Sequence, residues 1–346
     1  MVIMASLFTP EMIWGTFIGL VVAFAIPMIF VAYGGMYSEH SGIVNIALEG
    51  IMVVGAMTSV IVCRQLDPQV TSGALPSWLA MFIAILASGI VGALFSLLLS
   101  FAANHLKADQ TIAGTAINIM APAIFLVGAT AINSGVETDW ISWPAWVKFQ
   151  PEIFGITSRS FLRSFSVYTI CLETTFFALV LIPVAALILN RTRFGLRLRS
   201  CGEHPEASAS LGLNVFGYRY AGVSISGFLA GIGGTAYTLA STSTVYGDVA
   251  GIGFLAIAVM IFGNWDSLKI LAAAVFFAFF KTLGNMTTTL GNSENAFLKA
   301  LVSFPNAGII YAMLPYIVTL IVLIFTSKHS QAPKAEGTVF DISRRS

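Results

Sequence analysis

Three polar side chains stand inside long apolar stretches of this chain, where they could contact a polar solute. Asn45 and Glu49 lie in one apolar stretch, and Asn118 lies in another. Because Asn45 and Glu49 are four residues apart, we expect both on one face of a helix. An amide donates and accepts hydrogen bonds, which suits an uncharged polar solute such as a sugar or a nucleoside. Asn45, Glu49 and Asn118 are therefore our candidates for lining a solute pathway.

Each of these residues also has a structural interpretation. An ionised side chain at mid-membrane costs about 3 kcal/mol on insertion scales, so Glu49 must face protein or a water-filled cavity. Glu49 could instead cap or brace a neighbouring broken helix. Asn118 could form an interhelical hydrogen bond, worth about 0.6 kcal/mol on average in a membrane. Of the other ionisable groups in apolar stretches, we expect Glu173 to reach water and Lys281 to extend outward along the surface.

No enzyme motif accompanies these side chains. The sequence has no GxxxxGK[ST] phosphate loop, HExxH or GxSxG, and its four histidines lie at or beyond the ends of the apolar stretches. Cys63, Cys171 and Cys201 lack metal-ligand spacing, and Cys63 could pair with Cys171 or remain a buried thiol. We therefore expect a protein that is not an enzyme, binds no metal or cofactor, and does not itself hydrolyse ATP.

The elements that hold these side chains are predicted to be membrane helices. Of 346 residues, 57% are hydrophobic and 10% are charged, and the mean hydropathy is +0.87. A helix needs roughly 20 apolar residues to cross a bilayer. About nine stretches qualify, the seventh being short: 14–37, 43–63, 78–101, 111–132, 168–190, 220–240, 252–263, 268–283 and 308–326. We predict an all-α, polytopic transmembrane helical bundle with about nine membrane segments, one of them short or broken.

Charge indicates the orientation of this bundle. Residues 191–219, here called the coupling segment, contain five arginines, an excess typical of cytoplasmic loops. If all nine stretches span, the amino terminus is outside and the carboxyl terminus inside. Residues 1–326 would form one transmembrane domain with an outer loop at 133–167. Residues 327–346 would form a cytoplasmic tail that we expect to be disordered.

Glycines predict close approaches between helices. Gly227, Gly231 and Gly234 have the small-residue spacing of membrane helix interfaces, and no lysine follows them as in a phosphate loop. A weak internal echo links residues 45–55 with residues 253–263, two Gly-bounded apolar segments that enter from opposite sides in this topology. Inverted repeats with interrupted helices are a device of transporters, although this echo could be chance.

Four motifs together resemble a known family: SEHSGIVNIALEG (38–50), GTAINIMAP (114–122), FGLRLRSCGEHPEASASLGLNV (194–215) and GFLAIAVMIFGNW (253–265). They are similar to motifs of permease subunits of ABC importers in the branched-chain amino acid permease superfamily. The match runs in order over most of the chain. Patterns of the type SERSGxxNIxLEG and CGExPxAAxxxGINV look like the simple-sugar and nucleoside branch. The resemblance implies a subunit of a bacterial plasma (inner) membrane importer.

The resemblance also implies a role for the coupling segment. Its helix signal, over 203–213, has Glu203, Pro205 and Glu206 near the start and Gly212 as a stop. In the family, a short coupling helix here seats in a cleft of the cytoplasmic ATPase. The implied coupling residues are Glu203, His204, Pro205, Glu206, Ala207 and Gly212. This chain departs from the family in having Ala-Ser-Ala at 207–209 and His204 where relatives often have Asn.

The partners implied by the resemblance are a cytoplasmic ABC ATPase, a second permease that is homologous or identical, and an extracytoplasmic substrate-binding lipoprotein. ATP and Mg²⁺ would be used by the ATPase. Membrane lipid surrounds the chain, and its net charge of +1 gives no argument for nucleic acid. The solute would pass Asn45, Glu49 and Asn118 as two ATPase subunits close and open.

Two other functions remain open from sequence. A branched-chain amino acid importer would need a site for the solute carboxylate, which a broken helix amino terminus could supply. A channel or ion-coupled transporter acting alone would need a coupling site, for which Glu49 is the candidate. A membrane scaffold would leave the basic coupling segment and its embedded helix unexplained.

Overall fold

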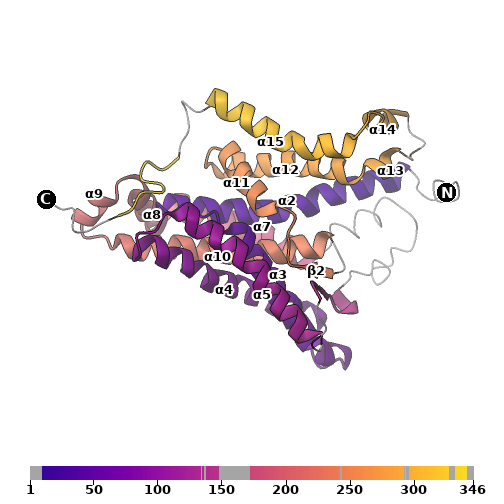
Figure 1. The fold of residues 1–346 in the computed structure, drawn as a ribbon, viewed down its shortest axis with the longest axis horizontal. Coiled ribbons are helices and arrows are strands. Elements are labelled where there is room, and N and C mark those ends of the chain that lie inside the picture. Colours follow the sequence, from indigo (N-terminus) through magenta and orange to yellow (C-terminus); the bar gives the residue numbers. More distant parts are fainter. Residues whose placement is uncertain are drawn as a thin grey trace.

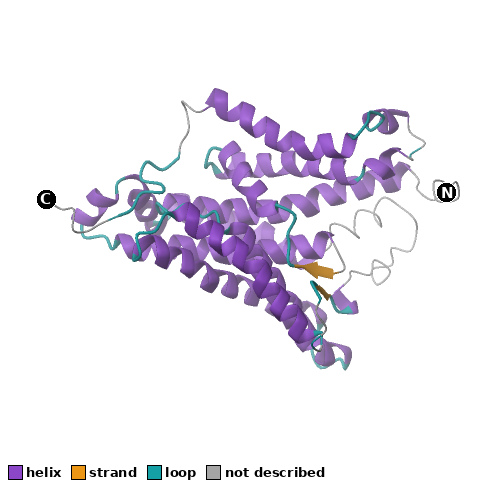
Figure 2. Ribbon diagram, in the orientation of Figure 1, coloured by secondary structure: helices purple, strands orange, loops and turns teal. Residues whose placement is uncertain are grey.

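The apolar stretches fold into helices in the computed structural model (Figures 1 and 2). The structure describes residues 10–133, 135, 138–147, 172–241, 244–291, 293, 296–326 and 332–340. The long elements are α2 (Pro10–His40), α3 (Leu48–Thr71), α4 (Ser77–Asn104), α5 (Gln110–Ile132), α7 (Leu172–Arg191), α10 (Val215–Ser241), α12 (Ser267–Asn285) and α15 (Ala307–Thr326). The short elements are β1 (Trp140–Ser142), η1 (Ala145–Val147), α8 (Arg193–Glu203), α9 (Pro205–Ser210), β2 (Thr244–Tyr246), α11 (Ile252–Phe262), α13 (Thr287–Gly291) and α14 (Ala296–Leu301).

Short polar side chains fix where two of the long helices begin. The Asp109 carboxylate accepts hydrogen bonds from the backbone N–H groups of Thr111 and Ile112 at the start of α5, at 2.8 and 3.1 Å. Asp266 does the same for Leu268 and Lys269 at the start of α12. These caps satisfy N–H groups that have no partner within the helix, so the apolar runs begin as helices at defined residues.

The helices support a multi-pass membrane protein. Among the described residues, six helices are long and apolar enough to cross a bilayer, namely α2, α3, α4, α5, α10 and α12. The apolar parts of α7, α11 and α15 are shorter. Each predicted stretch therefore contains a helix, but the predicted number of about nine membrane segments is not confirmed.

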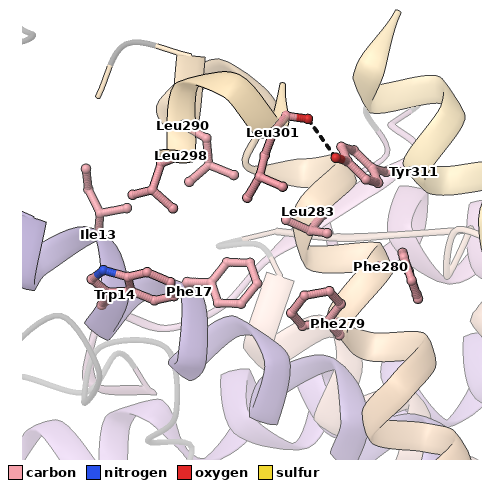
Figure 3. A pocket seen from close by; sticks show the side chains of 10 residues that line it. All are labelled: Ile13, Trp14, Phe17, Phe279, Phe280, Leu283, Leu290, Leu298, Leu301 and Tyr311. Carbon is pink, nitrogen blue, oxygen red and sulfur yellow. Dashed lines mark hydrogen bonds between the residues drawn. The ribbon is translucent and has the colours of Figure 1, made fainter. Parts of the chain in front are cut away.

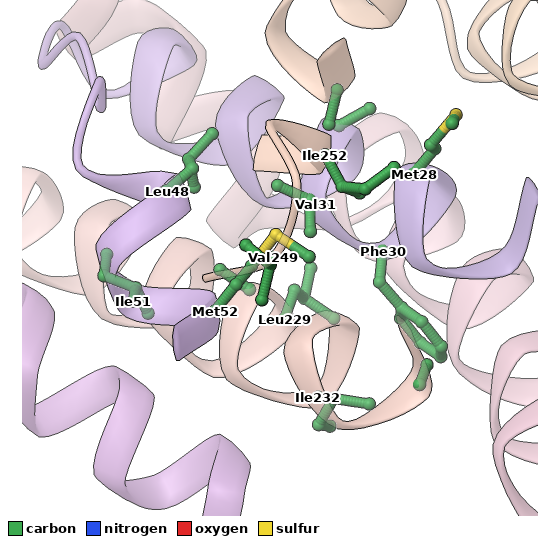
Figure 4. Packing of buried hydrophobic residues seen from close by; sticks show 14 of the residues in the cluster. Met28, Phe30, Val31, Leu48, Ile51, Met52, Leu229, Ile232, Val249 and Ile252 are labelled. Atoms are coloured by element: carbon green, nitrogen blue, oxygen red, sulfur yellow. The ribbon is translucent and has the colours of Figure 1, made fainter. Parts of the chain in front are cut away.

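Helix α10 lies at the centre of the bundle and packs against α2, α3 and α4. Figure 4 shows Met28 and Phe30 of α2, Met52 of α3 and Ile232 of α10 in one buried apolar cluster. A Cβ added to Gly231 would lie 2.3 Å from the Ser88 carbonyl oxygen of α4. The prediction that the glycines of α10 serve close packing is thereby confirmed.

The outer loop predicted at 133–167 is described only in part, and that part packs on the helix ends. Strand β1 pairs antiparallel with β2, with Ile141 opposite Val245. The indole Nε1 of Trp146 donates a hydrogen bond to the Asp67 carboxylate near the end of α3, at 2.9 Å. Cys171, the candidate disulfide partner of the buried Cys63, lies outside the described residues.

Residues 332–340, which we name the strap, pack against the end of the bundle that carries α8 and α9 (Figure 1). Phe340 is 5% exposed and joins a small apolar cluster with Cys201 and Val215. Disorder was expected for the whole tail, because its polar composition offers little apolar area to bury. For the strap this expectation is wrong, since Phe340 supplies an apolar anchor.

Candidate functional site

The candidate site is built around an irregular stretch, residues 41–47, between α2 and α3. We name it the interrupted segment. The sequence predicted a helix from residue 43, but α3 begins only at Leu48. Asn45 is 2% exposed. Its amide nitrogen donates to Ser226 Oγ of α10 at 2.8 Å, and its amide oxygen accepts from the Ala47 N–H at 3.1 Å. Asn45 therefore precedes the helix, and the prediction that it shares a helical face with Glu49 is wrong.

Asn118 of α5 holds the junction between the interrupted segment and α3. Its Oδ1 accepts a hydrogen bond from the Gly50 N–H at 2.8 Å, and its Nδ2 donates to the Ile46 carbonyl at 2.9 Å. One amide thus satisfies a free N–H of the first helical turn and a carbonyl of the irregular backbone. The hydrogen-bonding interpretation of Asn118 is confirmed for this structure.

Glu49, in the first turn of α3, caps the start of the short helix α11. Its two carboxylate oxygens accept from the Gly251 N–H at 2.8 Å and the Gly253 N–H at 2.6 Å. Gly251 has φ +72°, a left-handed conformation that sets the chain's entry into α11. The negative charge lies at the positive end of the helix dipole. The capping interpretation of Glu49 is confirmed.

These contacts lie deep in the bundle. Ser226, the partner of Asn45, is eleven residues into α10, about 16 Å from its start at 1.5 Å per residue. Asn118 is eight residues into α5, about 12 Å from its start. Irregular backbone at membrane depth is tolerated only inside protein or beside a water-filled cavity. The starts of α3 and α11, which belong to the two echoing segments, meet here through Glu49.

Three further polar residues, which our reading of the sequence did not place in the site, surround the start of α11. Lys281 of α12 reaches the Ala250 carbonyl at 3.5 Å, with Glu49 and Asp248 as its acidic neighbours. The Asp248 carboxylate accepts from the Ala250 N–H at 2.9 Å. The Tyr316 hydroxyl of α15 lies beside Gly251. The sequence could have indicated Lys281, because a lysine inside an apolar helix is unusual, whereas no local pattern pointed to Tyr316.

The side chain of Glu173, the other acidic residue in an apolar stretch, lies outside the described part of the structure.

Gln110 also supports the interrupted segment. It is 4% exposed, and its Oε1 accepts from the Val44 N–H at 2.8 Å. Together with Asn45 and Asn118, it replaces the backbone hydrogen bonds that a continuous helix would supply. Side chains from α3, α5 and α10 thus hold the starts of α3 and α11 in place. A shift of any of these helices would change which polar groups face the site.

The coupling segment contains two helices where one was predicted over 203–213. Helix α8 ends at Glu203, and His204 is non-helical, so Glu203 does not belong to the short helix. Helix α9 has Pro205 at its first position and Glu206 in its first turn. Gly212 has φ +83°, and a Cβ there would meet nothing within 4 Å. Ala207 is exposed and Leu211 is 83% exposed, whereas Ser208 of α9 is buried. Pro205 and Glu206 at the helix start and Gly212 at its end are confirmed. The placement of Glu203 at the start of this helix is wrong, because Glu203 ends α8.

An apolar cavity lies at the other end of α2 and differs in character from the candidate site. It has a volume of about 320 Å³ and is lined by side chains of α2, α12, α13, α14 and α15 (Figure 3). The Tyr311 hydroxyl points to the Leu301 carbonyl and donates to it at 2.6 Å. The lining therefore offers a polar solute almost no hydrogen bonds, and the cavity is not a candidate solute site.

Comparison with known proteins places the chain in a family. The family described as "Branched-chain amino acid transport system / permease component" matches residues 17–326. The chain is 37% identical over 324 residues to the guanosine ABC transporter permease protein NupQ of Bacillus subtilis, covering 93% of this chain and 95% of NupQ. It is 36% identical over 326 residues to the nucleoside ABC transporter permease protein NupC of Lactococcus lactis, covering 91% and 93%.

A more distant match is the guanosine ABC transporter permease protein NupP of Bacillus subtilis, 25% identical over 250 residues, covering 72% of this chain and 68% of NupP. No solved structure matches the chain significantly. The family match covers the interrupted segment with the helices around it, the start of α11 and the coupling segment. The chain belongs to this family of permease components, and it is a membrane transport subunit of an ABC importer rather than an enzyme.

Proposed function

We propose that this chain carries nucleosides across the membrane as one of two permease subunits of an ATP-driven importer. The observation that carries the choice of solute is the capped start of α11. The two carboxylate oxygens of Glu49 already accept the hydrogen bonds of the Gly251 and Gly253 N–H groups. A solute carboxylate would need that same positive helix end and would meet the Glu49 charge. An uncharged solute with hydroxyl and ring nitrogen groups meets no such conflict.

The relatives support the same choice. Two proteins named as guanosine or nucleoside permeases match this chain over more than nine-tenths of its length. The polar groups at the site are mainly amides and hydroxyls, together with the Glu49 carboxylate, which is already bonded to backbone N–H groups. Such groups suit a neutral solute with many hydrogen-bonding groups. Asn45, Glu49 and Asn118 would line the pathway in an arrangement in which some of their present hydrogen bonds are exchanged for bonds to the solute.

Transport follows from two arrangements of the permease pair. ATP would bind more tightly to the ATPase arrangement that pushes on α9, and only this difference in affinity can drive the permease between states. Glu203, His204, Pro205, Glu206, Ala207 and Gly212 would form or border the surface that receives this push. ATP and Mg²⁺ would be bound by the ATPase.

The partners of this chain would be a cytoplasmic ABC ATPase, a second permease and an external substrate-binding lipoprotein. The chain resembles both NupQ and NupP, two permeases of one organism, which supports pairing with a homologue rather than with a second copy. The arginines of the coupling segment support placing α8 and α9 on the cytoplasmic side. With nine spanning segments, the amino terminus would be outside.

A competition assay tests the solute class. The complete complex in proteoliposomes would take up labelled guanosine in the presence of the binding lipoprotein and ATP. We expect unlabelled nucleosides to reduce this uptake and leucine to leave it unchanged. Competition by leucine, or labelled leucine uptake exceeding guanosine uptake, would overturn the nucleoside assignment. Uptake by the single subunit without the ATPase would favour a stand-alone transporter.

Replacing Gly212 with valine is expected to reduce uptake at least tenfold while leaving insertion into the membrane intact. The left-handed conformation at φ +83° costs a residue with a Cβ about 1–2 kcal/mol, and more for a branched one. Valine would therefore reorient α9 relative to α10. Co-purification of the ATPase and uptake are the measurements.

Gly212→Asn is the matched control, because asparagine adopts this conformation more readily. It should retain most ATPase binding and uptake. Equal losses in the two variants would show that backbone conformation at residue 212 does not control docking.

A further inference from the structure

The strap joins two parts of the chain that are far apart in sequence. The Ala335 N–H donates to the Gly202 carbonyl in the last turn of α8, at 2.9 Å. The Thr338 carbonyl accepts from Nη2 of Arg219 on α10, at 3.1 Å. The strap thus supplies a partner to a terminal carbonyl of α8, which has no partner within its own helix. It also fastens to the helix that follows α9.

Arg219 is the anchor of this junction. It is 0% exposed although it belongs to the basic coupling segment. Its guanidinium carbon lies 5.8 Å from the centre of the Phe340 ring, and Phe340 meets Phe216 edge-on at 5.4 Å. Nε and Nη1 of Arg219 have no hydrogen-bond partner among the described atoms. Phe340 therefore covers a buried cation that the rest of the junction leaves only partly satisfied.

Phe340 also fills the space between the helices of the coupling segment. Its apolar cluster contains Cys201 of α8 and Val215 of α10, with Ala209 of α9 packed against it. Helix α9 has only six residues and is separated from α8 by the non-helical His204. A short helix on such a joint needs outside contacts to keep a fixed direction. Phe340 provides one contact shared by all three helices.

The same strap lies against the interrupted segment of the candidate site. Gly337 packs beside the Val44 side chain, and Gly42 lies beside the Arg219 guanidinium. Val44 is next to Asn45 in the chain, and its N–H is held by Gln110. The strap therefore contacts the coupling segment on one side and the segment that carries Asn45 on the other.

We infer that the strap is a positioning element that joins the coupling segment and the interrupted segment into one rigid unit, so that movement of α9 reaches Asn45. The inference rests on the proposed function, because it concerns how the ATPase drives this site. Phe340 and the buried Arg219 carry the connection, and neither touches the solute. Loss of the strap should leave α9 able to bind the ATPase but poorly connected to the site.

The test compares transport with ATP consumption in the complete complex. In proteoliposomes, we expect Phe340→Ala to lower the guanosine taken up per ATP hydrolysed by about tenfold, while the ATPase still co-purifies and hydrolyses ATP. Removing residues 332–346 should have the same effect or a larger one. Phe340→Tyr keeps the aromatic ring and should restore the ratio.

Two matched controls separate this role from simple stability. Val339 is adjacent to Phe340 but 44% exposed, so Val339→Ala should keep the normal ratio. Removing only residues 341–346 leaves the strap complete and should also keep it. An unchanged ratio in both Phe340→Ala and the longer truncation would overturn the inference. So would a parallel loss of ATPase binding, hydrolysis and uptake, because that pattern indicates a purely structural strap. Failure of the unaltered complex to transport guanosine would instead contradict the proposed function.

Discussion

Replacing Glu49 with alanine is expected to lower nucleoside uptake by about a hundredfold. The change removes the acceptor for the Gly251 and Gly253 N–H groups at the start of α11. A buried N–H left without a partner costs roughly 1–3 kcal/mol, and about 1.4 kcal/mol corresponds to a factor of ten. Helix α11 would therefore begin elsewhere or separate from α3. Initial uptake rate per assembled complex is the measurement.

Two variants sharpen this prediction. Glu49→Gln keeps one acceptor oxygen, so its uptake should fall between the wild-type and alanine values. Gln65→Ala, at an exposed position on the same helix, should leave uptake unchanged. If Glu49→Ala transported at the normal rate with normal assembly, the cap at α11 would have no part in the transport cycle.

The second large effect is expected at Gly231, where Gly231→Val should prevent the bundle from packing. The added Cβ would lie 2.3 Å from the Ser88 carbonyl, and Gly55 of α3 approaches the same residue closely. Overpacking of a core usually costs about 1–3 kcal/mol, and contacts with rigid backbone lie at the upper end or above it. We expect a large fall in melting temperature and in monodisperse protein after detergent extraction.

Gly291→Ala is the comparison for Gly231. A Cβ at Gly291 would lie 3.7 Å from Val302, an ordinary contact, so this variant should keep the wild-type melting temperature. Normal stability of Gly231→Val would mean that α10 does not pack closely against α4 and α3 at this depth.

Local patterns in the sequence predicted much of the fold. Each long apolar run became a helix, because satisfying the backbone inside a bilayer leaves few alternatives. Pro205, Glu206 and Gly212 act within a few residues of themselves, so their effects on α9 could be predicted. Small-residue spacing likewise predicted the close packing at Gly231.

The site depended on contacts that sequence spacing does not reveal. Glu49 bonds to Gly251, 202 residues away, and Asn118 bonds to Gly50, 68 residues away. The helical spacing of Asn45 and Glu49 was misleading, because side chains of other helices replace the backbone bonds of residues 41–47. Asn45 instead accepts from the Ala47 N–H just before α3, and Glu49 is the acidic residue in the first turn of that helix.

Arg219 shows a similar limit. Its position in a basic segment suggested a charge that sets orientation, and the structure places it 0% exposed beneath Phe340. The tail, 119 residues further along at Thr338, and Gly42 of the interrupted segment both lie against its guanidinium. Charge counts predict which side of a membrane a segment occupies, but they do not identify the one arginine that packs inside.

Photolabelling tests the central claim that nucleosides pass the start of α11 beside the interrupted segment. An azido-guanosine would be transported by the complete complex, crosslinked during turnover and mapped by mass spectrometry. We predict labels within residues 41–50 or 247–254 that disappear when excess guanosine is added. Competed labelling confined to the apolar cavity of Figure 3, or spread over the outer surface alone, would contradict the account.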